Sequence, residues 1–402
     1  MAKKVRTVIS LEQALSLPYA TWRFAHLGWR VIRIEATPSG PADPGDPNRY
    51  IGTPVAGRDR SSYFLAQNVG KESLVLNLKA PRGREILHRL IRELPADVFC
   101  CNTLPSRYGA LGIDYETLRA LQPELIWGGI SAMGPQYPDV PGYDPAIQAM
   151  VGYMELTGDP HGPPTLAGIP LTDLKAGDEL YAGVLAALVD PTPGVGKRID
   201  VSMLQAAASW LITTLPLLNF PHDPGEVSRS GNQHRKFIPS DVFQTLDGYL
   251  YFTVGNDLQW RRLVQIPKFA CCSTPVRFAN AGRHKEREAM FADVRAVFAR
   301  YPTEELARDL TDAKIPWARV NDVPSAAKLP AIASKMTATR TPDGRRINLQ
   351  PLPVDSDSPP LELSFPPAYG EHTCSILAEI GFSTTEVNEL LAQGVAFAPA
   401  AP

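Results

Sequence analysis

The sequence predicts an α/β fold with a mostly parallel sheet, and two patterns in the first half of the chain indicate it. Short apolar runs of strand composition alternate with longer segments whose apolar residues recur at helical spacing. Strands separated by helices pair in parallel, because each helix carries the chain back across one face of the sheet. At 402 residues the chain exceeds a typical single domain, so we expect a large domain and a smaller one.

The large domain is expected to open with a helix over 19–27 that ends at Gly28, a residue that often terminates helices. Pro81 suits the first turn of a later helix. No G-x-G-x-x-G follows any expected strand, so this Rossmann-like region lacks a dinucleotide fingerprint. The expected strands and intervening helices are strands 31–35, 73–78, 96–101 and 124–131, and helices 81–94 and 115–121.

The second half of the chain gives the domain limits. We expect a large domain over 1–218, a linker over 219–239 that is rich in Pro, Gly, His and Ser, a small domain over 240–330, and a segment 331–402 that returns to the large domain. Alternating apolar residues at 361, 363 and 365 favour an edge strand. The further expected elements are helices 146–154, 174–188, 203–218, 284–299 and 303–313, a turn at 191–196, strand 248–254 and two short C-terminal helices.

Composition excludes several functions. The formal net charge is −2, so neither nucleic acid nor an anionic membrane is expected as a partner. No apolar run is long enough for a signal peptide or a transmembrane helix, so we expect a soluble, cytoplasmic protein. The five cysteines include the adjacent pairs Cys100-Cys101 and Cys271-Cys272, which suits reduced thiols. No C-x-x-C or H-E-x-x-H occurs, so no metal site is expected.

Asp173 is the most informative single residue. A Pro- and Gly-rich stretch over 162–172 leads to it, and an apolar stripe at helical spacing follows. One interpretation is an N-cap aspartate, the commoner role for an aspartate before a helix. The other is a nucleophilic carboxylate whose charge the free N–H groups of that helix hold.

An ordered set of motifs resembles the class III CoA-transferase family, which is formyl-CoA transferase-like and also contains α-methylacyl-CoA racemases. The resemblance extends over nearly the whole chain, and the order of the motifs is more specific than any one of them. The motifs are Pro18-Tyr19-Ala20-Thr21, Pro141-Gly142-Tyr143-Asp144-Pro145, Leu156-Thr157-Gly158-Asp159, Gly162-Pro163-Pro164-Thr165, the Asp173 turn, Gly196-Lys197-Arg198-Ile199-Asp200 and Gly370-Glu371-His372-Thr373.

This resemblance implies a function and an architecture. It implies that Asp173 is the nucleophile of a CoA-transferase, which passes CoA from an acyl-CoA to a carboxylic acid through an aspartyl anhydride and an aspartyl-CoA thioester. CoA thioesters are then substrates, no cofactor is permanently bound, and succinyl-CoA is a donor by analogy. The implied fold is a Rossmann-like large domain with a smaller α/β domain in an interlocked dimer.

The residue at position 143 helps to decide between the transferase and racemase branches of the family. The racemase pattern places a histidine in the Gly-His-Asp step, and this chain has Gly142-Tyr143-Asp144. Tyrosine, with a usual pKa of about 10, is a poor proton shuttle for an α-carbon but can orient a thioester or carboxylate oxygen. The transferase is therefore favoured over an acyl-CoA racemase or epimerase. Asp144 is either a second acid near the nucleophile or the N-cap of the following helix.

The expected CoA contacts are Asn102, Lys71, Lys79 and Arg107. By resemblance Asn102 lines the CoA groove, and the two lysines suit phosphate recognition, although solvated surface positions fit them equally. Formyl-CoA transferase has arginines where this chain has Ala36 and Ala110. Arg107 lies three residues before Ala110 and is a candidate substitute on the same helix face.

Two further hypotheses concern the lid and the partner. Ser230, Gly231 and Asn232 are the candidate lid, with an ordinary interdomain turn as the alternative. The missing arginines suggest one subunit of a heteromeric enzyme, in outline like succinyl-CoA:benzylsuccinate CoA-transferase, or a non-catalytic subunit. Either a homodimer or a heterodimer with a related subunit is expected.

Overall fold

The computed structural model describes residues 5–189, 194–355, 357 and 361–400, and the turn expected at 191–196 lies partly outside them. Contacts divide the chain into two compact units. The described residues of Met1–Val151, Gly168–Ile212 and Ser334–Pro402 form the first unit, and Gly152–Ala167 with Thr213–Ala333 form the second. This division places 213–239, including the expected linker, in the second unit. The expected limits of independently folding domains stay predictions.

The first unit is built on a seven-stranded sheet with the order β12-β3-β2-β1-β4-β5-β6. All neighbours are parallel except β12, which is antiparallel to β3. The α/β prediction is therefore confirmed. The first strand was missed, because its short apolar run carries no alternation. The strands are β1 Thr7–Leu11, β2 Arg30–Glu35, β3 Lys71–Leu76, β4 Val98–Cys101, β5 Ile126–Ser131, β6 Arg198–Ser202 and β12 Ala396–Phe397.

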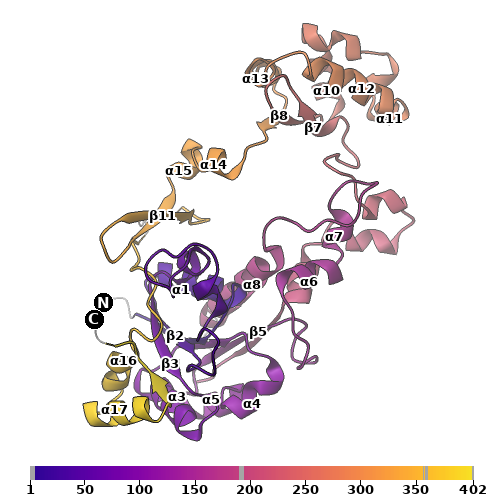
Figure 1. The fold of residues 1–402 in the computed structure, drawn as a ribbon. Helices are drawn as coiled ribbons and strands as arrows, with labels where there is room; N and C mark the ends of the chain where they lie inside the picture. The colour runs from indigo at the N-terminus through magenta and orange to yellow at the C-terminus, as the bar shows by residue number, and fades with distance from the viewer. Residues whose placement is uncertain (1–4, 190–193, 356, 358–360, 401–402) are drawn as a thin grey trace. The chain divides into compact units, whose positions relative to one another are not determined.

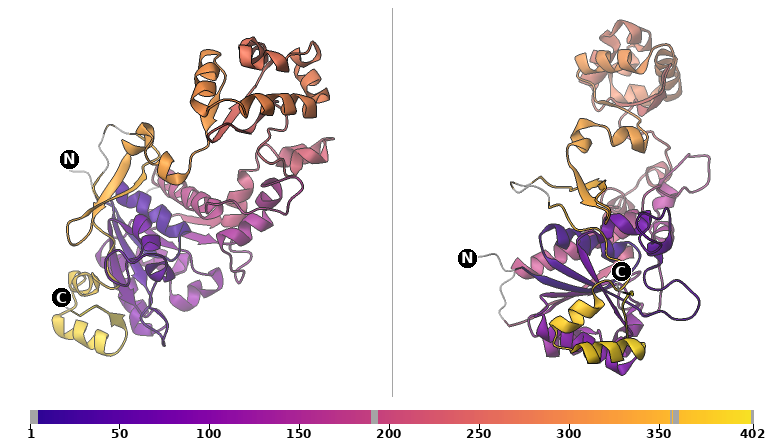
Figure 2. Two further views of the ribbon diagram at one scale, coloured as in Figure 1. Left: turned by 45° about the horizontal axis from the view of Figure 1, so that its top comes forward. Right: turned by 60° about the vertical axis from the view of Figure 1, so that its left-hand side comes forward.

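Helices cover both faces of this sheet (Figures 1 and 2). On one face α1, Ser16–His26, and α8, Leu171–Val189, pack against each other. On the other face an apolar core joins the sheet to four helices, because alternate strand residues such as Ile32 and Ile34 point into it. These helices are α3 Pro81–Glu93, α5 Tyr115–Leu121, α16 Thr373–Glu379 and α17 Thr384–Ala392.

Three expected elements differ from the structure. The apolar helix expected over 146–154 is two helices, α6 Asp144–Met150 and α7 Tyr153–Leu156, separated by Gly152 with φ +87°. The long helix expected over 203–218 ends early, as α9 Met203–Ser209. Pro216 limits the helical conformation of the residue before it, and exposed apolar residues follow Ser209 where a core-facing stripe was expected.

The third difference is the segment with alternating apolar residues at 361, 363 and 365. It forms no strand, although it lies on the fold, since the carbonyl of Ser364 accepts a hydrogen bond from the N–H of Gly70. The remaining elements of the first unit are α2 Ser62–Leu65, α4 Tyr108–Leu111, β10 Met336–Arg340 and β11 Arg346–Pro351, the last two forming an antiparallel pair.

The second unit has its own sheet and core. Its antiparallel sheet has the order β7-β8-β9, and aromatic rings of Phe243, Phe252 and Phe298 stack in the core. Its elements besides α7 are β7 Ser240–Gln244, β8 Tyr249–Thr253, β9 Trp317–Arg319, α10 Asp257–Gln265, α11 Asn280–Lys285, α12 Arg287–Phe298, α13 Thr303–Asp312, α14 Val323–Ala326 and α15 Pro330–Ala333. Within the described ranges, no helix is long and apolar enough to cross a membrane.

Candidate active site

The candidate site lies where two helices begin side by side. Ser16 and Asp173 stand in the first turns of α1 and α8, and eight residues further along each helix the rings of Phe24 and Tyr181 lie 5.3 Å apart. The two helices therefore run in the same direction. A Cβ at Gly177 would lie 2.6 Å from the carbonyl oxygen of Ser16, so only glycine permits this close approach. The positive ends of both helix dipoles consequently meet beside Asp173.

Asp173 is not an N-cap, which corrects one of its two predicted interpretations. Its helix begins two residues earlier, at Leu171. The N–H groups that were expected to hold its charge are bound elsewhere: that of Leu171 donates to the carbonyl of Ile169, 2.8 Å away, and that of Thr172 to Oδ1 of Asp144, 2.7 Å away.

The environment of Asp173 favours its neutral form. The side chain is partly buried. Burial and the negative charge of Asp144 raise the pKa of Asp173 to about 7, while a hydrogen bond with the Ser16 side chain acts in the opposite direction. A carboxylate with this pKa is more basic than usual, and both of its protonation states are populated near neutral pH.

Asp144 anchors the start of α8. It is the first residue of α6 rather than its N-cap, so the cap interpretation is wrong for its own helix. Its buried carboxylate accepts hydrogen bonds from the N–H of Thr172 at 2.7 Å, from the Thr172 hydroxyl at 2.8 Å and from Nε2 of Gln148 at 2.7 Å. The neighbouring Tyr143 occupies the N-cap position and is 72% exposed.

Asn102 lies at the point where the sheet order reverses. The loops after β1 and β4 leave the sheet side by side there, and ligands of doubly wound folds bind in the crevice outside such strand ends. The Asn102 amide donates to the carbonyl of Gln13 at 2.8 Å and accepts from the Gln13 N–H at 3.1 Å. The structure thus ties Asn102 to the loop that leads into α1.

The structure contradicts both predicted roles of Lys71, since the residue is buried and neither solvated nor open to a phosphate. Its ammonium group donates to Glu12 at 2.6 Å, to the carbonyl of Pro18 at 3.0 Å and to Asn68 at 3.1 Å. A single lysine between strands carries no signal of such burial, because its partners come from other parts of the chain.

The two other basic candidates are open to solvent. Lys79, directly after β3, and Arg107, directly before α4, are both exposed. Their contact with CoA stays a prediction.

The candidate lid belongs to the second unit. Gly231 has φ +59°, and its N–H donates to the carbonyl of Gly158 at 2.9 Å. Gly231 and Asn232 are exposed, and Ser230 is partly exposed. The structure places the loop and Asp173 in different units, and a lid role for this loop stays a prediction.

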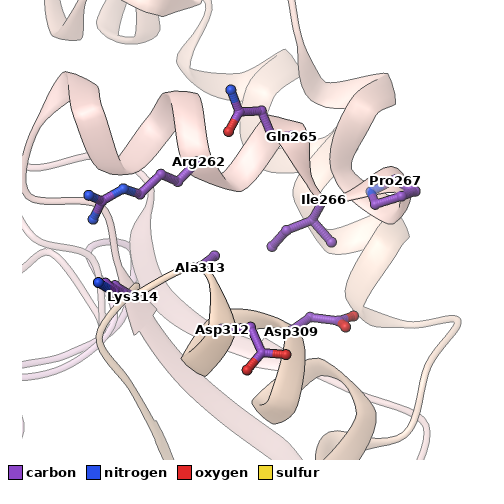
Figure 3. Close-up of a pocket in the computed structure, with 8 residues that line it drawn as sticks. All are labelled: Arg262, Gln265, Ile266, Pro267, Asp309, Asp312, Ala313 and Lys314. Atoms are coloured by element: carbon purple, nitrogen blue, oxygen red, sulfur yellow. The ribbon is translucent and has the colours of Figure 1, made fainter.

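Ser16 is the site residue that sequence analysis missed. The available signal was its position in the opening motif, two residues before Pro18, and it became meaningful only when α1 and α8 were seen to start together. The second unit holds a cavity of 530 Å³ between α10 and α13 that contains none of the predicted site residues (Figure 3). Arg262 lies on its α10 wall, and Asp312 and Lys314 lie opposite.

Comparison with known proteins identifies relatives along almost the whole chain. The sequence profile described as CoA-transferase family III matches residues 5–373. A succinate–glutarate CoA-transferase of Agrobacterium fabrum is 32% identical over 388 residues, which cover 93% of this chain and 94% of the relative. An acetyl-CoA:oxalate CoA-transferase of Acetobacter aceti is 34% identical over 333 residues, covering 82% of this chain and 83% of the relative.

Solved structures give the same picture of the fold. The crystal structure of a CAIB/BAIF family protein from Brucella suis aligns with a TM-score of 0.81 and 28% sequence identity, over 93% of this chain and 98% of that one. The resemblance inferred from the ordered motifs is confirmed by these matches, which span both units.

Proposed function

The chain belongs to CoA-transferase family III, and on that premise we propose that its reaction runs through the carboxylate of Asp173. The observation that carries the proposal is the environment of this residue. Asp173 is partly buried, stands where two helices begin, and has a pKa raised to about 7 by burial and Asp144. Carboxylates with strongly shifted pKa values are concentrated at functional sites.

In the first half of the reaction, CoA moves from the donor to the enzyme. A carboxylate oxygen of Asp173 attacks the thioester carbonyl carbon, the C–S bond breaks, and CoA leaves as a thiolate while a mixed anhydride forms. The thiolate then attacks the Asp173 carbonyl carbon of this anhydride. The donor acid leaves as its carboxylate, and CoA is held as an aspartyl thioester.

In the second half, the same steps run in reverse with another acid. The acceptor carboxylate attacks the aspartyl thioester, the thiolate leaves, and a new mixed anhydride forms. The thiolate attacks the acceptor's carbonyl carbon, which releases the new acyl-CoA and restores the carboxylate of Asp173. The thioester energy is kept throughout, provided that water is excluded while the anhydride exists.

The start of α1 supplies donors that suit the tetrahedral intermediates. Among the described residues, none accepts a hydrogen bond from the backbone N–H of Ser16 or of Leu17. These groups lie at the positive end of α1, next to Asp173, where they are suited to stabilise a developing oxyanion. The Ser16 side chain also favours the ionised form of the carboxylate, since it acts to lower the pKa of Asp173.

For the substrates, we propose short dicarboxylic acids as acceptors, and succinyl-CoA or acetyl-CoA as donors. The support is the names of the relatives, a succinate–glutarate and an acetyl-CoA:oxalate CoA-transferase. Succinyl-CoA is accordingly the first donor to examine, with glutarate and oxalate as acceptors.

Trapping of the aspartyl intermediate tests the proposal. The protein, as isolated and with any chain that co-purifies as a homodimer or heterodimer partner, is incubated with succinyl-CoA or acetyl-CoA and quenched with borohydride or hydroxylamine. Peptide mass spectrometry is expected to find the modification on the peptide that carries Asp173. The variant Asp173→Asn should lose it. The matched control Asp178→Asn, one turn further along α8, should keep it.

Two other results would contradict the proposal. Absence of any modification with every donor and partner would favour a non-catalytic subunit. Exchange of the α-hydrogen of a 2-methylacyl-CoA with deuterated solvent, without acyl transfer, would favour a racemase despite Tyr143.

A further inference from the structure

The loop between β1 and α1 is held by side chains at two successive residues. Both backbone groups of Gln13 are bonded to the amide of Asn102, as described above. At the next residue, the N–H of Ala14 donates to Oδ1 of Asp46 at 3.2 Å, and its carbonyl accepts from Nδ2 of Asn48 at 3.0 Å. Four successive backbone polar groups are thus fixed by three side chains from other loops.

Ala14 adopts a conformation that its residue type disfavours. Its φ is +60°, in the left-handed region that glycine enters readily and other residues rarely do. Such conformations persist only where the surrounding contacts impose them, and they occur most often at functional sites. Here the hydrogen bonds at Gln13 and Ala14 are those contacts.

The contact at Asp46 is itself rigid. Asp46 is buried; its Oδ2 accepts from Arg33 at 3.0 Å, and its own N–H donates to Glu35 at 3.0 Å. Asn102, by contrast, lies on a loop after β4 and is partly exposed. The Asn102 contact is therefore the one of the two that can be removed without breaking a buried ion pair.

The held loop sets the position of the first turn of α1. Ser16 follows Ala14 by two residues, its side chain lowers the pKa of Asp173, and its backbone N–H is bonded to none of the residues that the structure describes. A shift of the loop would move these groups relative to Asp173. Displacements of about 1 Å in such a group cost up to about a hundredfold in rate.

We propose that Asn102 is a positioning residue, which acts through the backbone of Gln13 and the left-handed Ala14 to hold the start of α1 against Asp173. This role differs from the direct CoA contact expected from the sequence, and it rests on the proposed function of Asp173. It predicts that loss of Asn102 affects the chemical step, whereas a direct CoA contact predicts that it affects CoA affinity.

The test compares Asn102→Ala, Asn102→Asp, and Asn102→Ala combined with Ala14→Gly. Hydrogen exchange is measured at the Tyr19 amide, whose N–H donates to the carbonyl of Leu15 at 2.9 Å in the first turn of α1, and acylation of Asp173 by succinyl-CoA is measured in parallel. In Asn102→Ala we expect exchange to be faster and kcat lower by about tenfold, with the KM for succinyl-CoA within about twofold of its original value. Asn102→Asp keeps an acceptor for the Gln13 N–H. Its kcat and its exchange rate should therefore lie between those of Asn102→Ala and those of the unmodified protein.

The variant that combines Asn102→Ala with Ala14→Gly is the decisive test of the positioning role. Glycine holds φ +60° without strain, so we expect it to restore part of kcat, about three- to fivefold, and to slow exchange again. The matched control is Asn256→Ala, which removes an asparagine that caps α10 in the second unit. It should leave kcat, KM and exchange at Tyr19 unchanged.

The outcomes separate this proposal from the one on which it rests. A raised KM with unchanged kcat and exchange, and no recovery with Ala14→Gly, would overturn the positioning role and make Asn102 a CoA ligand. If the unmodified protein forms no aspartyl adduct, the proposed function fails, yet the exchange measurements still decide whether Asn102 holds the loop.

Discussion

Two groups of carboxylates in the first unit are both withdrawn from water, yet the pKa is lowered in one group, at Glu35, and raised in the other, at Asp173. One is a buried charge network, whose carboxylates and cations lie on β2, on the first residue of β3, and in the segments that follow β1 and β2. The other is the Asp173–Asp144 pair at the start of α8. The network consists of Glu12, Glu35, Asp46, Arg33, Arg49 and Lys71.

In the network each carboxylate has cationic neighbours. Arg33 lies 3.0 Å from Asp46 and 3.3 Å from Glu35, and Arg49 lies 2.5 Å from Glu35. Burial alone would raise the pKa of Glu35, but the charges of the two arginines lower it to about 2. Burial likewise opposes ionisation of Glu12, and Lys71 with Arg33 holds its pKa below the usual value.

In the Asp173–Asp144 pair, burial and the neighbouring charge shift the pKa of Asp173 in the same direction. The neighbour of Asp173 is another carboxylate, so burial and repulsion together raise its pKa to about 7. Because both groups are buried, the comparison teaches that the sign of the neighbouring charge separates a carboxylate that is kept ionised from one whose neutral form is favoured. A carboxylate with a pKa of about 2, such as Glu35, is a weak base, whereas one with a pKa near 7 is a stronger base.

The largest expected effect comes from breaking the network at its centre. Arg33→Met leaves Asp46, Glu35 and Glu12 buried without this cation, so we expect the free energy of unfolding to fall by about 3–5 kcal/mol. Denaturant unfolding followed by tryptophan fluorescence measures it. Arg58→Met removes an ion pair with Asp43 whose arginine side chain is 81% exposed, and it should cost less than about 0.5 kcal/mol. Equal losses in the two variants would refute the structural role of the network.

A smaller effect of opposite sign is expected at Asp173. Its pKa is raised on folding, so its contribution to stability is complete below the unfolded value and is lost as the pH rises through 7. Asp173→Asn has no carboxylate to ionise, so the variant avoids this loss of stability at higher pH. The variant should match the unmodified protein near pH 4 and be more stable by about 1–3 kcal/mol at pH 8.

Glu35→Gln is the matched counterpart of that variant. The pKa of Glu35 is lowered on folding to about 2, so its contribution is present above the unfolded value and is lost as the pH falls through 2. Glu35→Gln should therefore destabilise the protein at neutral pH and much less in acid. A stability difference that is independent of pH in both variants would contradict the contrast between the two groups.

The sequence predicted one of these groups better than the other. The motif around Asp173 is local, so its position near a helix start could be inferred from the adjacent apolar stripe. The network is assembled by the sheet order: Lys71 meets Glu12 across 59 positions of the chain, and only the parallel pairing of β1, β2 and β3 brings these segments together. Arg33 alternates with Ile32 and Ile34 in the same strand, which indicates a half-exposed strand although both faces are covered.

The same reason explains why the sequence predicted the candidate site only in part. The sequence left two roles open for Asp144, an acid near Asp173 or the cap of its own helix, because only the cap can be inferred from adjacent residues. In the structure the carboxylate bonds Thr172, 28 residues away. Pairings at this separation have no local pattern, yet this one fixes the carboxylate whose charge adds to the effect of burial on the pKa of Asp173.

The smallest expected effect is a shift in the pH profile when Asp144 loses its charge. Attack requires the ionised form of Asp173, so kcat/KM should rise with pH up to about 7 and then become level. Asp144→Asn keeps an acceptor for Thr172 and removes the repulsion. Because burial remains the larger cause of the raised pKa, the midpoint should fall by only about one unit or less. The control Asp178→Asn should leave the profile in place. An unmoved midpoint in Asp144→Asn would mean that burial alone raises the pKa of Asp173. The contrast between the two groups of carboxylates would then rest on desolvation rather than on the sign of the neighbouring charge.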